Sequence, residues 1–289
     1  MKILIIGNGF LAVPVIQRLE SEGHQILVFS RTRSARVNCQ QVIGDIFYFE
    51  EFIRVFDWKP QVVIHTAWIT TPGIYRNDIS NFQYAEFTKN LAKFVTRSDV
   101  KHLIILGTCA EYGRQVGPSM AGFTKPSPST LYAQQKVAAL HSVRETLQES
   151  DLRLTWARIF YPYGPNQDSK RLIPRLISSL KRGESVALAD TSSIYDWITT
   201  RDIASGISWI LNNELPVEID VGTSFGYTNL ELKMILEELL EINHQEALRK
   251  QHNFGLNEVF VASKNSPLFT SGWSPEDSLR SGLNWVLGQ

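Results

Sequence analysis

The chain has 289 residues, of which 43% are hydrophobic and 20% charged, and its 29 basic side chains balance 29 acidic ones. This composition supports a substantial core in one large domain or two closely joined ones. Because the net charge is zero and the basic residues are scattered, the sequence argues against a nucleic-acid-binding footprint and against a basic membrane-binding patch. Its apolar runs are well below the ~18 residues that a membrane span needs.

The N-terminus and the cysteines indicate a compartment. MKILIIGNGF runs straight from the first residue into a strand and a turn, so we expect no targeting peptide. Cys39 and Cys109 are too few for a disulfide framework. We therefore expect a cytoplasmic protein, and no cluster of ligands in the sequence predicts a metal site.

The first predicted elements are a strand over residues 2–6, a tight turn and a helix. Gly7 permits the turn, Gly9 lets the backbone approach a pyrophosphate at the helix N-terminus, and Ala12 keeps helix and strand close. Pro14 falls in the first helical turn, where its missing N–H costs little. The sequence therefore predicts a dinucleotide-binding turn; the alternative is a glycine turn that binds nothing.

The second predicted strand, residues 25–30, ends at Arg31 and Arg33. An NAD-binding fold usually offers an acidic residue here to the adenosine ribose. Two arginines instead favour a 2′-phosphate, which they can grip with charge-assisted hydrogen bonds. The interpretation is NADP(H) over NAD(H), with a solvated basic loop as the alternative.

Strands and helices continue to alternate. We expect strands before Asp45, at 61–68 and at 102–107, and a helix at 81–97 that packs on the sheet or at a subunit interface through an apolar stripe. The stripe comprises Phe82, Ala85, Leu91 and Phe94. This alternation predicts a doubly wound parallel sheet whose ligands bind at the carboxyl ends of the strands.

Tyr132 and Lys136 lie four residues apart at the start of a segment with helical spacing, and therefore on one helix face. An ammonium beside a phenol favours the phenolate and so lowers the phenol's pKa. Such a tyrosine can exchange a proton with a carbonyl or an alcohol. On its own the pair is also compatible with an ordinary solvated contact.

After Pro165 the alternation weakens. Residues 166–188 predict a loop, a basic amphipathic helix and a strand, residues 219–224 a strand, and residues 229–242 an amphipathic helix. Five basic residues of the first segment are either diphosphate ligands or merely solvated: Lys170, Arg171, Arg175, Lys181 and Arg182.

Eight motifs in order now carry a family resemblance: GNGFLA, GDI, VIHTA, TCAEYG, Tyr-x3-Lys, RIFYPYGP, YDWITTRDIA and SGWSPEDSLRSGL. Together they resemble the extended short-chain dehydrogenase/reductases, the NAD(P)-dependent nucleotide-sugar epimerases, dehydratases and reductases. The resemblance implies an α/β fold, a Rossmann-type doubly wound parallel sheet with a small C-terminal α/β substrate domain. We expect the NADP-binding domain over residues 1–165, with 196–222 returning to it, and the substrate-binding domain over 166–195 and 223–289.

The resemblance also assigns roles to individual positions. It implies a catalytic triad of Thr108, Tyr132 and Lys136. It implies a cofactor site made of Gly7, Gly9, Phe10, Leu11, Ala12, Arg31, Arg33, Asp45, Ile46, Ala67, Lys136 and Phe160. It implies substrate contacts from Thr108, Tyr132, Tyr161 and Asn166.

Four departures from the family pattern bear on function. Ile6 stands at the family's first glycine. Cys109 and Ala110 replace the Asp-Glu pair that dehydratases use as acid and base, which disfavours dehydration. Tyr161 replaces a usual Asn, and Tyr195 a usual Arg, both on the expected substrate side.

The expected function is an NADPH-dependent reductase of a keto sugar nucleotide, with Tyr132 as the proton donor. The first alternative is a nucleotide-sugar 4-epimerase, which uses the same triad and usually retains NAD. The second is a catalytically silent NADP-binding regulator, a class that often lacks the Tyr or the Lys. The expected partner is a sugar nucleotide, and the expected assembly is a homodimer.

Overall fold

The computed structural model describes residues 1–188, 190–242 and 258–288. A seven-stranded sheet forms its centre, and every neighbouring pair of strands in it is parallel. The strand order is β10-β6-β5-β4-β1-β2-β3. The strands are β1 (Lys2–Ile6), β2 (Gln25–Ser30), β3 (Gln40–Ile43), β4 (Val62–His65), β5 (His102–Thr108), β6 (Arg153–Ile159) and β10 (Glu218–Val221). The predicted fold class is confirmed.

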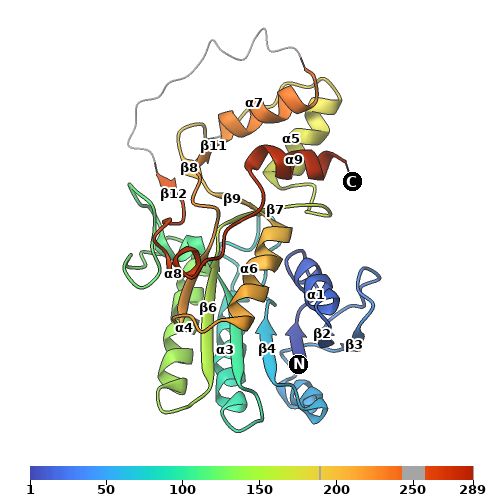
Figure 1. The fold of residues 1–289 in the computed structure, drawn as a ribbon, viewed down its shortest axis with the longest axis vertical. Helices are drawn as coiled ribbons and strands as arrows, with labels where there is room; N and C mark the ends of the chain where they lie inside the picture. Colours follow the sequence, from blue (N-terminus) through green and yellow to red (C-terminus); the bar gives the residue numbers. More distant parts are fainter. Residues whose placement is uncertain (189, 243–257, 289) are drawn as a thin grey trace.

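Helices cover both faces of this sheet (Figure 1). Successive side chains of β1 point to opposite faces, so Ile3 and Ile5 pack with helices α1 (Ala12–Ser21) and α6 (Thr200–Asn212). Leu4 and Ile6 pack on the other face with helices α3 (Asn81–Val95) and α4 (Leu131–Leu147). Both sides of the central strands are therefore buried, which explains their continuous apolar sequences.

Short helices fill two of the connections. The first is α2 (Phe49–Phe52), which continues directly into the 3-10 helix η1 (Ile53–Trp58) before β4. The second is the 3-10 helix η2 (Cys109–Tyr112), which follows β5 without a break.

The buried face of α3 differs from the expected stripe. Phe82 is 51% exposed, whereas Tyr84, Phe87 and Leu91 are buried. Phe87 packs edge-on against Phe52 of α2, with 5.1 Å between the ring centroids. The buried face of α3 therefore runs through Tyr84 and Phe87 and does not include Phe82. Phe87 is buried by an aromatic residue of α2, a contact that the periodicity within α3 does not reveal.

A smaller unit lies beyond the carboxyl ends of the strands (Figure 1). Its core is built around Leu176, Leu232 and Leu283, from three helices. Its helices are α5 (Leu172–Lys181), α7 (Asn229–Leu239) and α9 (Leu279–Leu287), and its strands are β7 (Tyr161–Tyr163), β8 (Ile194–Tyr195), β9 (Trp197–Thr199), β11 (Tyr227–Thr228) and β12 (Val259–Phe260). Helix α8 (Pro267–Thr270) packs instead on the core of the central sheet through Leu268, beside β10. The strand expected just before residue 188 is not formed.

The chain order reverses between β1 and β4. From β1 the sheet grows outward to β2 and β3, and from β4 it grows in the other direction. Doubly wound sheets bind their ligands at this reversal, beyond the carboxyl ends of the strands. In the part of the chain that the structure describes, no helix is long and apolar enough to cross a membrane.

Candidate active site

A cleft of about 1050 Å³ lies at the carboxyl ends of the strands. The sheet contributes the loops that follow β1, β2, β3, β4, β5 and β6, and the small unit contributes Arg171, Tyr195 and Phe260. This volume is at the upper end of the range of about 300–1,000 Å³ for small-molecule and cofactor sites. The switch-point loops and the small unit therefore enclose one shared binding space.

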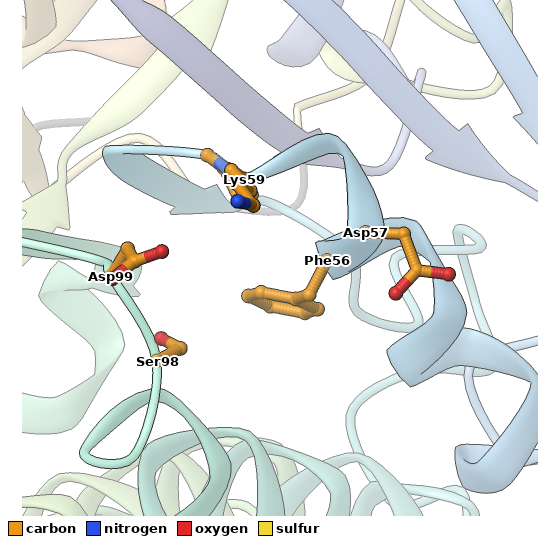
Figure 2. A pocket seen from close by; sticks show the side chains of 6 residues that line it. Phe56, Asp57, Lys59, Ser98 and Asp99 are labelled. Atoms are coloured by element: carbon orange, nitrogen blue, oxygen red, sulfur yellow. The ribbon is translucent and has the colours of Figure 1, made fainter.

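A second, smaller hollow of about 250 Å³ lies at the opposite edge of the sheet, before β4 and β5. Figure 2 shows Phe56 pointing into it, with Lys59 on one side and Ser98 and Asp99 on the other. Because ligands of doubly wound sheets bind at the carboxyl ends, we place the functional site in the larger cleft.

The loop between β1 and α1 forms the floor of one end of the cleft. Gly7 has φ +106°, and a Cβ there would lie 2.5 Å from the Thr66 hydroxyl oxygen, so only glycine fits. A Cβ on Gly9 would meet nothing within 4 Å. The first turn of α1 has no side-chain cap and no acidic residue, so its free N–H groups and the helix dipole are available to an anion. The loop fits the pyrophosphate of a dinucleotide.

Arg31 and Asp45 lie together at the same end of the cleft. Both line it, and both influence the pKa of Tyr84: burial raises this pKa most, Arg31 lowers it and Asp45 raises it. Arg33 is exposed and does not line the cleft. Only one of the two predicted arginines thus faces the space where an adenosine ribose would lie.

Thr108 and Tyr132 meet in the middle of the cleft. Thr108 ends β5 and caps η2, where its hydroxyl accepts a hydrogen bond from the Ala110 N–H. Tyr132 lies in the first turn of α4, which Thr130 caps by accepting from the Ala133 N–H. The two side chains that the family resemblance assigned to catalysis therefore face the same space.

Burial sets the protonation of this pair. It raises the pKa of the Tyr132 phenol, and the interaction with Thr108 only partly opposes it. The direction is opposite to our expectation that Lys136 lowers this pKa. In the protein alone the Tyr132 phenol is a protonated hydrogen-bond donor at neutral pH.

Lys136 lies behind the cleft wall and does not line it. It is 4% exposed, its ammonium donates to the Leu106 carbonyl at 2.6 Å, and it lies 3.8 Å from the centre of the Trp68 ring. Burial lowers the pKa of Lys136 to about 7, and Glu111 opposes that shift. Trp68, one residue after the VIHTA motif, is therefore the side chain that neighbours this ammonium.

Glu111 is a fully buried carboxylate directly behind Thr108. It accepts hydrogen bonds from the Thr108 backbone N–H at 2.8 Å and from the Trp156 indole, and it pairs with Arg158 at 2.7 Å. Arg158 has a second partner, Glu218, at 2.7 Å. This buried network fixes the backbone at the end of β5.

Aromatic side chains wall the other half of the cleft. The Tyr161 ring packs edge-on against Tyr195 at 4.6 Å, and Tyr195 stacks on Phe260 at 5.6 Å. Tyr75 packs edge-on against Tyr132 at 5.0 Å. Burial raises the pKa of Tyr161 well above its usual value. The two tyrosines that depart from the family pattern thus make this wall aromatic.

Most of the predicted site residues line one cleft: Gly7, Gly9, Phe10, Leu11, Ala12, Arg31, Asp45, Ile46, Ala67, Thr108, Tyr132, Phe160 and Tyr161. Three of them do not line it: Arg33, Lys136 and Asn166. Of the five basic residues considered after Pro165, only Arg171 does.

Sequence reasoning gave no role to Trp68, Tyr75, Arg76 or Glu111. One signal was available for Glu111, since Thr108-x-x-Glu111 has the spacing of a capping box, and both bonds of that box are present. Trp68, Tyr75 and Arg76 carry no comparable pattern, because the loop after β4 is positioned by contacts with Asn81, Tyr132 and Arg171 from other segments.

The fold and the cleft are those of a dinucleotide-binding α/β protein whose cleft is walled on one side by the small unit. The sequence profile of the "NAD dependent epimerase/dehydratase family" matches residues 3–222. The chain belongs to this family and is an enzyme of the extended short-chain dehydrogenase/reductase type.

Known relatives resemble the chain over nearly its whole length. It is 21% identical to bovine dTDP-D-glucose 4,6-dehydratase, over 98% of this chain and 86% of that one. It is 23% identical to dTDP-L-rhamnose 4-epimerase of Burkholderia thailandensis, over 98% and 93%. The structure of Thermus thermophilus UDP-glucose 4-epimerase with NAD superposes with a TM-score of 0.86 at 22% identity, covering 100% of this chain and 98% of that one. At these identities the solved structure supports the fold alone.

Proposed function

We propose that the protein is an NADPH-dependent reductase of a keto sugar nucleotide. The observation that carries the proposal is that Thr108 and Tyr132 open onto the same cleft as the Gly7–Ala12 loop. Family membership supports a nicotinamide cofactor and a sugar nucleotide, since similar proteins include structures with NAD and with UDP-glucose.

The residues present fit such a cofactor. The uncapped N-terminus of α1 and Gly9 would hold the pyrophosphate, and Arg31 would hold a 2′-phosphate on the adenosine ribose. When bound, NADPH supplies the hydride. Arg31 favours NADP(H) because it lines the cleft where an NAD-binding chain would offer a carboxylate.

The chain's own residues then handle the proton. The Tyr132 phenol, kept protonated by burial, donates to the substrate carbonyl oxygen as negative charge develops there. The Thr108 hydroxyl donates a second hydrogen bond to the same oxygen. Lys136 lies behind this pair, and Glu111 favours its charged form against the burial that lowers the pKa of Lys136 to about 7.

Dehydration is disfavoured by the residues after Thr108. Burial raises the pKa of the Cys109 thiol, so the thiol stays protonated and is no base at neutral pH. Ala110 has no titratable group. Water elimination needs an acid and a base at these positions, so this chain lacks the pair that the dehydratases use.

The second candidate is a 4-epimerase, which Thr108 and Tyr132 serve equally well. It is favoured by the sequence similarity to dTDP-L-rhamnose 4-epimerase over nearly the whole chain. Epimerisation regenerates its cofactor, whereas reduction consumes one reduced nicotinamide per product.

One experiment separates the two. Purified enzyme is incubated with NADPH and with UDP-, dTDP-, GDP- or CDP-linked hexoses and 4-keto hexoses, and cofactor absorbance and sugar stereochemistry are followed together. A reductase oxidises NADPH in proportion to product. Inverted sugar without net cofactor oxidation would instead establish the epimerase.

A further inference from the structure

The loop after β4 places an arginine beside the proton donor. The Tyr132 backbone N–H donates to the Arg76 carbonyl at 2.9 Å, which ties this loop to the start of α4. The neighbouring Tyr75 ring packs on the Tyr132 ring. Arg76 lines the cleft. It therefore belongs to the part of the cleft wall that adjoins Tyr132.

The surroundings of the Arg76 guanidinium are aromatic hydroxyls. It lies against the Tyr75 phenol, which raises the pKa of Arg76, and close to the phenols of Tyr161 and Tyr195. Within the described ranges, Arg76 forms no ion pair with a carboxylate, whereas Arg114 elsewhere in the cleft pairs with Glu258 at 2.8 Å. Arg76 thus presents an unneutralised charge to the cleft.

One of the phenols near Arg76 can donate a hydrogen bond to a ligand and another cannot. The Tyr195 O–H already donates to Asp190 at 2.6 Å. The Tyr161 hydroxyl has no hydrogen-bond partner in the part of the protein that the structure describes, and burial keeps it protonated. A guanidinium beside a free phenolic O–H forms a matched set of donors for an oxyanion.

A second arginine strengthens the positive field. The Arg171 guanidinium lies 5.1 Å from the centre of the Tyr75 ring and donates to the Thr70 carbonyl at 2.5 Å. It also lacks a carboxylate partner among the described residues. Arg76 at the Tyr75 hydroxyl and Arg171 over the ring face bring two positive charges to one side of the reaction space.

We propose that Arg76 binds a carboxylate on the sugar of the substrate, with Tyr161 as a second donor and Arg171 reinforcing the field. This rests on the proposed function, because it requires a sugar nucleotide in the cleft. The anion belongs to the sugar because Arg76 adjoins the tyrosine that packs on Tyr132, where the reacting carbon lies. A planar carboxylate matches the guanidinium fork.

The test compares nucleotide sugars that differ only in the carboxylate. UDP-glucuronate and UDP-glucose, and GDP-mannuronate and GDP-mannose, are titrated calorimetrically into the full chain with NADP⁺. The Tyr132→Phe background prevents turnover. The series is repeated with Arg76→Ala, with Arg171→Ala, and with Arg97→Ala as a control, since Arg97 is exposed and lies outside the cleft.

We expect the Kd of the uronate to be lower than that of its neutral partner by roughly 10-fold or more. The reason is that the arginine and the phenol give charge-assisted hydrogen bonds to a carboxylate and not to a hydroxymethyl group. Arg76→Ala should reduce this ratio to about 2-fold or less while the affinity for the neutral sugar changes little. Arg171→Ala should reduce it less, and Arg97→Ala not at all.

Two contrary results have different meanings. If nucleotide sugars bind but the carboxylate brings no advantage, or if Arg76→Ala weakens both members of a pair equally, the proposal for Arg76 is overturned and the proposed function stands. If no nucleotide sugar binds at all, the proposed function fails and this inference fails with it.

Discussion

The backbone N–H of Thr108 donates to the buried carboxylate of Glu111 at 2.8 Å. This bond places a negative charge directly behind a residue that must orient its hydroxyl toward a substrate oxygen. Arg158 neutralises the charge from the side away from the cleft. The position of Thr108 therefore depends on an ion pair that no substrate touches.

We predict that Glu111→Gln destabilises the fold by roughly 3 kcal/mol, because it leaves a fully buried guanidinium with one fewer charged partner. Urea denaturation followed by circular dichroism measures the change. Glu218→Gln is the matched control, since Glu218 pairs with the same Arg158 from a 17% exposed position and should cost less. Equal costs for the two variants would contradict the importance of the inner pair.

A second prediction concerns cofactor choice. Arg31 lines the cleft and Arg33 does not, so Arg31→Ala should reduce the preference for NADPH over NADH about tenfold, while Arg33→Ala should change it little. Fluorescence titration of both reduced cofactors measures the preference. Equal affinity of the wild type for both cofactors would sink the NADP assignment.

The central sheet could be predicted from the sequence because each of its strands and turns is specified by residues that are adjacent in the chain. Buried parallel strands such as Leu103–Leu106 are continuous apolar runs, and the glycine turn after β1 has one conformation that fits. The substrate half depends instead on contacts between distant segments. Arg76 and Arg171 are 95 positions apart in the chain and meet only at Tyr75.

The same distinction explains the pKa expectation that was wrong. Spacing correctly put Tyr132 and Lys136 on one face of α4. It gave no information about Trp68, which covers the ammonium, or about burial, which raises the pKa of the phenol. Desolvation is a property of the packed chain, so periodicity alone cannot predict which effect dominates.

A third prediction separates proton donation from binding. Tyr132→Phe should lower kcat by about a thousandfold and leave the Kd for NADPH nearly unchanged, because the hydroxyl is needed only when charge develops on the carbonyl oxygen. Thr108→Val removes one hydrogen bond to that oxygen and should cost about 3 kcal/mol in the barrier, so it should retain more activity. Single-turnover kinetics, with the substrate that the screen of nucleotide sugars selects, measures both. Wild-type turnover by Tyr132→Phe would show that the proton comes from elsewhere.

The last prediction uses the buried ammonium as a probe of stability. The pKa of Lys136 falls from 10.5 to about 7 on folding because burial disfavours its charged form. Between pH 7 and pH 10.5 the unfolded chain binds a proton on Lys136 that the folded chain does not bind. The contribution of Lys136 to the free energy of unfolding therefore rises with pH in this range and is constant outside it.

Lys136→Met removes the titrating group and keeps an apolar side chain of similar length. The variant should be more stable than the wild type near pH 7, and this advantage should shrink by several kcal/mol, on the order of 4, as the pH rises toward 10.5. Urea denaturation at a series of pH values measures the difference, with Lys101→Met at an exposed position as the control. If the difference in the free energy of unfolding between Lys136→Met and the wild type stays constant with pH, Lys136 keeps its charge when the chain folds. Only a lysine that loses its proton on burial links folding to pH in this range.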